Sequence, residues 1–328
     1  MKTTLATAAA VALVLGSAAA TACETRDKVV AAWLPIMQTT AYYVALEEGL
    51  FEKACIEIDS QKMQSPNHII DALVAGRADF GPPGAAAGIA MLAESKFPGT
   101  FKVFGLQGGG IAVNLINDAL IVRPDSPIAS FADLKGKTLG HVPGIQWRTI
   151  SRHMVRAAGL DPDTDVTLTD LAVAMQVPAV AGGSVDATLS LEPVGSVAAA
   201  SGKAKRAMTN PVAAVIADPF YSGASLLTTR FIRERPDVAR RVVEVIDAAT
   251  DLVNADFDTY KAIIPRYTPI QETQLDLLAK PYLRPFHALD ETDMTSYQAF
   301  VDIFVKEKVL AEPMDVRSKI LKPTDFPG

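Results

Sequence analysis

The amino-acid sequence predicts an α/β protein of two lobes, each a mainly parallel sheet flanked by helices. Two features predict this class: short apolar, strand-like runs alternate with amphipathic helical segments, and the same order of segments occurs before and after residue 130. The composition is that of a folded protein, because 49% of the 328 residues are apolar and 21% are charged. The net charge of −6, without a basic cluster, argues against a nucleic-acid-binding surface.

The first unit starts with the apolar run 29–33 and then alternates helix and strand. Ser65 is a good N-cap and Pro66 fits the first helical position, so a helix is expected there, ending at Gly76. The expected order is a strand at 29–33, a helix at 40–48 ended by Gly49, a strand at 56–58, the helix after Ser65, and a further element from 79. Strands joined by helices in this way form parallel sheets.

The second unit repeats this plan after residue 130. The expected order is a strand at 138–141, a helix after Pro143-Gly144, a strand at 166–168, a helix ending at Gly182-Gly183, and a strand at 187–191. Gly49-Leu50 corresponds to Gly159-Leu160, and Gly76 with Asp79 corresponds to Gly183 with Asp186. We infer two lobes built on one plan.

These repeats suggest the domain boundaries. We expect one lobe at 23–112 plus 225–328, which includes C-terminal helices, and a second lobe at 113–224. The runs 119–122 and 225–228 are expected to be long strands that cross between the lobes, with hinges near 113–116 and 222–226. The tail from Pro236 is expected to be helical and divided by prolines, which interrupt helices.

Residues 1–22 are expected to be an export signal. Lys2 supplies a positive charge, residues 5–15 form an apolar run of eleven residues, and Ala20-Thr21-Ala22 is a small-residue cleavage site before Cys23. An apolar run of this length is too short for a membrane-spanning helix, which needs about 20 residues.

Cys23 has two interpretations. Residues 20–23 loosely fit a lipoprotein-type cleavage box, with Ala20 where Leu is usual, so Cys23 is a candidate for lipidation. Alternatively, Cys23 forms a disulfide with Cys55, which lies just before the strand at 56–58, in an oxidising compartment. The sequence leaves both open.

Five segments carry motifs in a distinctive order: 45–53, 72–80, 131–140, Val185-Asp186-Ala187 with Glu192-Pro193, and 231–238. Together they resemble the periplasmic solute-binding proteins of the taurine, sulfonate, nitrate and pyrimidine-precursor type, over almost the whole chain after residue 22. The resemblance implies a type II two-lobe periplasmic-binding-protein fold with two crossing strands as hinge. It also implies a periplasmic protein that delivers a small molecule to the membrane permease of an ABC importer.

The position of a ligand follows from the fold class. In open α/β sheets, ligands lie beyond the carboxyl ends of the strands, beside helix N-termini with free N–H groups. Residues 81–85 are expected to be a loop at such a strand end, and glycines there and in 108–110 are expected to allow close approach of a ligand to the backbone. The candidate ligand-binding residues are Trp33, Gln38, Thr39, Gln64, Ser65, Gly84, Gln107, Gly144, Gln146, Trp147, Arg148 and Glu192.

Three of these candidates suggest the ligand's chemistry. Arg148 would bind a bidentate anion, and Trp147 would offer an aromatic face. Glu192 would accept a hydrogen bond from an amine or ring N–H. Each has a structural alternative: Arg148 as a solvated residue, Trp147 as packing between lobes, and Glu192 as a hinge carboxylate bonded to the backbone.

The sequence carries no catalytic constellation. His68, His141, His153 and His287 are scattered, without the spacing of a metal site, and no Gly-x-Ser-x-Gly motif occurs. We therefore expect no enzyme activity, cofactor or metal. Because of Arg148 beside helix N-termini, we expect a monomer that binds a small organic anion (sulfonate, carboxylate or nitrate-like). The alternatives are a planar heterocycle as ligand, such as a pyrimidine (thiamine precursor) or flavin, an enzyme of the same fold in pyrimidine synthesis, and a ligand sensor.

Overall fold

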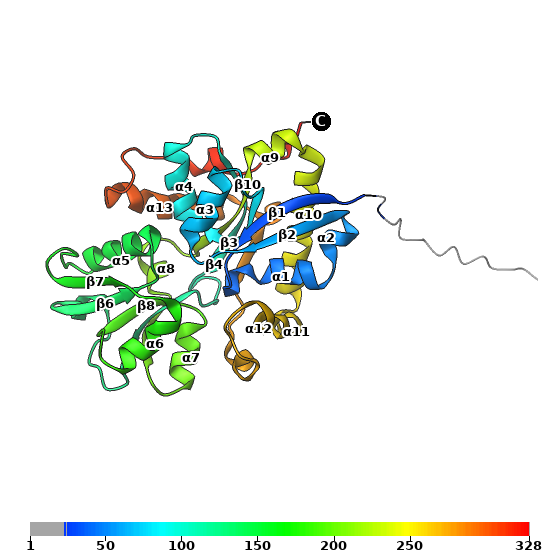
Figure 1. The fold of residues 1–328 in the computed structure, drawn as a ribbon. Helices are drawn as coiled ribbons and strands as arrows, with labels where there is room; N and C mark the ends of the chain where they lie inside the picture. Colours follow the sequence, from blue (N-terminus) through cyan, green and yellow to red (C-terminus); the bar gives the residue numbers. More distant parts are fainter. Residues whose placement is uncertain (1–22, 24, 328) are drawn as a thin grey trace, which may run out of the picture.

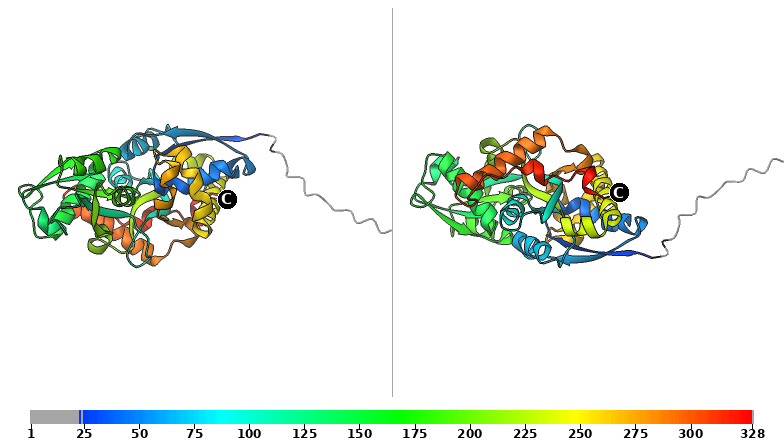
Figure 2. Two further views of the ribbon diagram at one scale, coloured as in Figure 1. Left: turned by 90° about the horizontal axis from the view of Figure 1, so that it is seen from below. Right: turned by 90° about the horizontal axis from the view of Figure 1, so that it is seen from above.

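The computed structural model describes residues 23 and 25–327, so the predicted export signal lies outside the described residues. The chain forms two lobes, each built around its own sheet, as the sequence predicts (Figure 1). Views from below and above show the same division, with the second lobe (green) at one end of the molecule (Figure 2). No helix among the described residues is both long and apolar enough to cross a membrane.

The larger lobe contains a six-stranded sheet in the order β11-β4-β10-β3-β1-β2. Its strands are β1 (Asp27–Trp33), β2 (Ile56–Lys62), β3 (Phe80–Ala86), β4 (Phe101–Gly109), β10 (Phe220–Thr228) and β11 (Tyr282–Pro285). β1 pairs in parallel with β2 and β3, whereas β10 runs antiparallel between β3 and β4. The carboxyl ends of β1, β2 and β3 therefore lie at one edge, beside the start of β10.

The second lobe contains a five-stranded sheet in the order β7-β6-β8-β5-β9. Its strands are β5 (Asp118–Val122), β6 (Lys137–His141), β7 (Val166–Asp170), β8 (Ala187–Leu191) and β9 (Lys205–Thr209). β6 lies parallel to β7 and β8, and β5 runs antiparallel to β8 and β9. The start of β5 is therefore at the same edge as the ends of β6 and β8.

Alternation along β1 explains how helices cover both faces of the larger sheet. Val29, Ala31 and Trp33 join the apolar cluster with α1 (Thr40–Glu47) and α10 (Pro236–Ala255). Ala32 joins the opposite cluster, together with α3 (Pro66–Val74), α4 (Ala87–Lys96) and α13 (Glu291–Lys306). Shorter helices complete this lobe: α2 (Leu50–Lys53), α9 (Thr229–Glu234), α11 (Phe257–Tyr260), α12 (Ile264–Tyr267), η1 (Met37–Thr39), η3 (Lys261–Ile263), η4 (Glu272–Leu277), η5 (Phe286–Ala288), η6 (Val316–Lys319) and η7 (Pro323–Asp325).

Five short or medium helices surround the second sheet: α5 (Ile145–Ala157), α6 (Val173–Ala181), α7 (Val194–Ala200), α8 (Pro211–Val215) and η2 (Phe131–Leu134). Of these, α5 contacts both α4 and α13 of the larger lobe. Apolar packing is continuous there, because one cluster of buried side chains includes residues of both lobes. The two lobes thus share part of their core on the side of α13.

Several predicted elements are confirmed. Ser65 caps α3, where its Oγ accepts a hydrogen bond from His68 N at 3.4 Å, and Pro66 is the first helical residue. Gly49, Gly76 and Gly159 follow α1, α3 and α5 with positive φ angles, as helix-ending glycines do. The two units do repeat one order of strands and helices.

Other expectations are wrong. The glycine-rich run 81–85 lies inside β3 instead of a loop. Pro82 and Pro83 lack N–H donors, and there the pairing of β3 with β10 is irregular: Gly81 and Ala85 face Leu226 and Ala224 across a register shift. The runs 119–122 and 225–228 lie within β5 and β10, so the chain crosses between the sheets at 110–117 and 210–219. In the tail, residues 282–285 form a strand that pairs with β4.

The two cysteines form a disulfide. Cys23 and Cys55 are bonded, with their Cα atoms 5.6 Å apart. The bond attaches the start of the described chain to the turn before β2. In this disulfide Cys23 has no free thiol to which a lipid could be attached.

Candidate functional site

The two lobes meet where the carboxyl ends of their parallel strands face each other. We call this region the interlobe junction and define it by residues from the larger lobe (Gln38, Thr39, Asn67, Gly84, Gly88, Ser222) and the second lobe (Gly144, Gln146, Arg148, Asp170). A Cβ at Gly144 would lie 3.2 Å from Asn67 Oδ1, so the start of α3 approaches the start of α5. The starts of these two helices, one from each lobe, therefore lie next to each other.

Gln146 is the most direct hydrogen-bonded link across the junction. Its Oε1 accepts from Gly88 N at 2.9 Å, and its Nε2 donates to the backbone oxygen of Ser222 at 2.9 Å. The side chain is buried, with both ends of the amide in use. Gln146 thus joins the start of α5 to α4 and β10 of the larger lobe.

Gln38 links the loop after β1 to the first crossing segment and to β10. Its Nε2 donates to Asn117 Oδ1 and to Ser222 Oγ, each at 3.0 Å. The Ser222 hydroxyl therefore accepts a hydrogen bond from Gln38 of the larger lobe, and the Ser222 carbonyl accepts one from Gln146 of the second lobe. Gln38 is 7% exposed, so this structure gives it a positioning role at the junction.

Gln107 has a similar role beside β3. Its Oε1 accepts from Gly84 N at 2.9 Å, and its Nε2 donates to Ser225 Oγ at 3.0 Å. Gln107 thereby occupies the N–H that the irregular pairing of β3 leaves free. It lies behind Gly84 and is buried.

Thr39 and Gly84 meet at the end of β3. Two features require glycine at position 84. A Cβ there would lie 2.7 Å from Thr39 Oγ1, and the φ angle of +96° is one that other residues rarely adopt. Thr39 is fully buried, and its Oγ1 has no hydrogen-bond partner among the described residues. A buried, unpaired hydroxyl is a candidate group for a ligand.

The start of α5 places Arg148 and Trp147 in different environments. The Arg148 side chain is 51% exposed, and its guanidinium lies 3.7 Å from Asp170 at the end of β7. Trp147 is 3% exposed and packs in the core shared by the lobes. The structure therefore offers a guanidinium at the junction, but the indole is used for packing.

Trp33 also packs inside a lobe. Its ring forms edge-on contacts with Tyr43 and Tyr267 at centroid distances of 5.5 and 6.0 Å, and Lys62 lies over it. Its Nε1 is buried without a partner among the described residues. Neither tryptophan presents a free face to a planar heterocycle.

Glu192 is engaged by its own lobe. One carboxylate oxygen lies 2.5 Å from Arg206 Nη2, and the other accepts from Ser196 N at 3.2 Å. Gly195 permits this arrangement, because a Cβ there would lie 2.6 Å from Glu192 Oε1. The Glu192 side chain is 6% exposed. Its hydrogen bonds go to other groups of the protein, as expected for a structural carboxylate and not for a ligand contact.

The two remaining candidates follow β2. Ser65 is occupied as the α3 cap, whereas Gln64 is exposed beside it. The structure therefore brings six of the twelve candidates to the junction, namely Gln38, Thr39, Gly84, Gly144, Gln146 and Arg148, and places Trp33, Trp147 and Glu192 inside the lobes. The candidates' contacts with a ligand stay predictions.

Sequence reasoning missed several junction residues. Asp170 ends β7, so the same rule of strand ends identifies it. Asn67, in the first turn of α3, could be found in the same way. Ser222 and its neighbour in the network, Asn117, carry no local signal, because their place depends on where the chain crosses between the lobes.

Burial shifts the pKa of two groups near the junction. Burial raises the pKa of Asp118, the first residue of β5, to about 6, although Asn117 and Val212 N donate to its carboxylate. Burial lowers the pKa of His141, which keeps this imidazole neutral at pH 7. The described residues contain no cluster of three or more His, Cys, Asp or Glu that could hold a metal ion.

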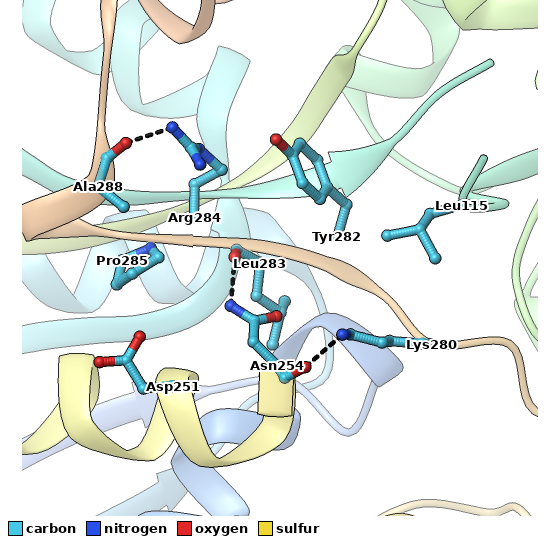
Figure 3. Close-up of a pocket in the computed structure, with 9 residues that line it drawn as sticks. All are labelled: Leu115, Asp251, Asn254, Lys280, Tyr282, Leu283, Arg284, Pro285 and Ala288. Carbon is cyan, nitrogen blue, oxygen red and sulfur yellow. Dashed lines mark hydrogen bonds between the residues drawn. The ribbon is translucent and has the colours of Figure 1, made fainter. Parts of the chain in front are cut away.

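Two cavities lie away from the junction. One, of about 240 Å³, lies between β11 and α10 and is shown in Figure 3. The protein uses its polar groups: Lys280 donates to the Asn254 carbonyl, Asn254 donates to the Leu283 carbonyl, and Arg284 donates to Ala288 O and Asp293. The other, of about 700 Å³, is a mostly apolar groove between α6 and α7, reached by Gln274 of the larger lobe.

Known proteins share this architecture. The crystal structure of the periplasmic aliphatic sulphonate binding protein SsuA from Escherichia coli superposes with a TM-score of 0.73 at 18% identity, covering 93% of this chain and 95% of that one. The desulfurization enzyme DSZB superposes with a TM-score of 0.67 at 16% identity, covering 92% and 98%. At these identities the likeness shows the fold alone.

Sequence comparison adds family evidence. A Brucella abortus (strain 2308) protein, provisionally named a binding protein, is 25% identical over 244 residues, which is 74% of this chain and 72% of that protein. The family model described as "NMT1/THI5 like" matches residues 36–258. This range extends from the loop after β1 to the start of α11 and includes the whole second lobe. The protein belongs to the NMT1/THI5-like family.

Proposed function

We propose that this protein is the extracytoplasmic solute-binding component of an ABC importer and that it captures a small organic anion at the interlobe junction. The observation that carries this proposal is the approach of two helix starts from different lobes, where Gly144 lies against Asn67 and Arg148 is half-exposed nearby. Helix N-termini and a guanidinium both favour an anionic group. The binding-protein relatives support the transport role.

The same junction explains how capture would work. The lobes are linked there by side chains such as Gln38 and Gln146, and the chain crosses between the sheets twice. Separation and closure about the crossings at 110–117 and 210–219 would admit and enclose a solute. The Cys23–Cys55 disulfide supports an exported protein, because such bonds persist in oxidising compartments. We expect a periplasmic monomer that meets the permease of the importer.

The ligand class can be tested by thermal melting of the purified chain with sulfonates, carboxylates, nitrate and pyrimidines. A ligand at 100 times its Kd stabilises a protein by about 2.7 kcal/mol. We expect the organic anions to raise the melting temperature, and Arg148→Ala to abolish this rise without changing the unliganded melt. Arg233→Ala, on an exposed side chain of the larger lobe, is the matched control.

Other outcomes would identify the alternatives. A response to pyrimidines alone would favour the planar heterocycle. Because DSZB is an enzyme with this fold, each stabilising compound should also be incubated with the chain and analysed by mass spectrometry. A new product would overturn a purely binding role, and binding to a receptor ectodomain instead of a permease would favour a sensor.

A further inference from the structure

Asp170 lies where the proposed anion would bind. Its Oδ1 accepts from Gly144 N, the backbone group just before α5, at 3.4 Å. Its Oδ2 lies 3.7 Å from Arg148 Nη2. These are the two groups of the second lobe that favour an anionic ligand, so the carboxylate of Asp170 already interacts with both.

The carboxylate is held loosely. Its contact with Arg148 is longer than a hydrogen bond, and the two side chains are 47% and 51% exposed. Exposed ion pairs of this kind add little stability. The third neighbour, His141 Nδ1, lies 3.5 Å from Oδ1, but it is bonded to Val142 O at 2.9 Å, and burial lowers the pKa of this imidazole. The Asp170 carboxylate can therefore move away from Gly144 N and Arg148 without leaving a buried charge unpaired.

The charge balance at this point matters for an incoming solute. Asp170 offsets the positive charge of Arg148. Asn67, which faces Gly144 from the larger lobe, is neutral. An anion that approaches the start of α5 therefore meets a guanidinium, that of Arg148, whose positive charge is already paired with Asp170.

We propose that Asp170 is an internal competitor for the anionic group of the solute and sets the affinity and selectivity of the site. This inference rests on the proposed function. An anion binds by displacing the Asp170 carboxylate from Gly144 N and Arg148, so anions that pair weakly with a guanidinium are rejected. Asp170 is a specificity-determining residue and takes no part in chemistry.

The test compares Asp170→Asn with the wild-type chain, using methanesulfonate, acetate and nitrate as probes in calorimetric titrations at low salt. Asparagine keeps an oxygen that can accept from Gly144 N but removes the competing charge. One unit charge about 4 Å away in water corresponds to about a fivefold change in affinity, so we expect affinity for a bound anion to rise about fivefold. Added salt should reduce the gain.

The matched control is Asp125→Asn. Asp125 is also an exposed partner of an arginine, Arg123, in the second lobe, but it follows the end of β5 that is remote from the junction. It makes the same change in net charge, and we expect it to leave affinity unchanged. In the double variant Arg148→Ala/Asp170→Asn anion binding should stay lost, as in Arg148→Ala, because Asp170→Asn removes a competitor and supplies no cation.

The outcomes separate this inference from the proposed function. If the wild-type chain binds an anion and Asp170→Asn binds it equally or more weakly, Asp170 does not compete and the inference is wrong. If neither form binds any anion but both bind a pyrimidine, the proposed ligand class fails. Unliganded melting curves identify a misfolded variant, and Asp170→Ala then serves as the second substitution, with the same expected gain.

Discussion

Arg156 of the second lobe forms a two-point contact with Glu307 of the larger lobe. Its Nε lies 3.2 Å from Glu307 Oε1, and its Nη2 lies 3.3 Å from Oε2. Arg152 and His153 approach the same carboxylate at 3.6 and 3.5 Å. The Glu307 side chain is only 1% exposed, so one buried carboxylate just after α13 holds three side chains of α5. This cluster fixes α5, whose first residues form the junction, against the larger lobe.

Removing the charge of Glu307 should loosen the attachment of α5. In Glu307→Gln, the two arginines lose their shared partner, but both are partly exposed and can be solvated by water. We therefore expect the free energy of unfolding to fall by about 2 kcal/mol, below the cost of breaking a fully buried pair. Urea denaturation measures this change. Glu312→Gln, on an exposed glutamate near by in the sequence, should leave the midpoint in place, and an unchanged midpoint for Glu307→Gln would show that the cluster adds no stability.

The sequence predicted the strands and helices whose signals are local. Ser65, Pro66 and Gly76 mark both ends of α3 by capping and backbone preference alone. β4 and β11 were missed, because their pairing joins residues far apart in the chain. No local signal places Pro82 and Pro83 within a strand, because β10 accommodates them only through an irregular register.

The candidate site shows the same limit. The rule of strand ends predicts a site at the junction, and Gln38, Gly84 and Gln146 do lie there. It cannot say which side chains the protein itself satisfies. The internal partners of Glu192 and Gln107, which are Arg206 and Ser225, come from β9 and β10, and nothing local in the sequence indicates these contacts.

Gly84→Ala should be much more damaging than an ordinary glycine substitution. The variant combines a strained φ angle of +96° with a Cβ only 2.7 Å from Thr39 Oγ1. We expect unfolding free energy to fall by about 3 kcal/mol, from backbone strain and overpacking together. Gly136→Ala is the matched control, because its φ angle is +73° but its Cβ would meet nothing within 4 Å.

The contribution of the close contact can be separated from backbone strain. Gly136→Ala should cost about 1 kcal/mol in chemical denaturation, from strain alone. Adding Thr39→Ala to Gly84→Ala removes the oxygen that the new methyl group would meet, so part of the loss should be recovered. Equal losses for the two glycine variants would mean that the Thr39 contact relaxes freely.

The disulfide should contribute measurably to stability. Cys23 and Cys55 are separated by 32 positions, and closing a loop of this size stabilises the folded state by about 3–4 kcal/mol on the chain-entropy account. Cys23→Ser, Cys55→Ser and the double variant should therefore lose the same amount in thermal or urea unfolding. The intact mass of the exported protein checks the bond directly: a lipid on Cys23 with a free thiol on Cys55 would contradict it.

Asp118 should make stability depend on pH in a distinctive direction. Burial raises the pKa of its carboxyl to about 6 in the folded protein, above the ordinary value near 4 of an unfolded chain. The folded state then binds the proton more tightly. The stabilisation is fully present below about pH 4 and is lost as pH rises through about 6. The contribution of this carboxyl to the free energy of unfolding should thus fall by about 2–3 kcal/mol between pH 4 and pH 7.

Other groups oppose this trend, so the measurement must be a difference. Burial lowers the pKa of His141 and His153, and their contribution is lost as pH falls instead. Subtracting the wild-type profile of unfolding free energy from that of Asp118→Asn cancels the histidines and leaves Asp118 alone. The changed hydrogen bond to Asn117 shifts this difference by a constant and does not alter its slope. We expect the difference to increase in favour of the variant from pH 4 to pH 7; a flat difference would mean that the carboxyl titrates alike in the folded and unfolded chains.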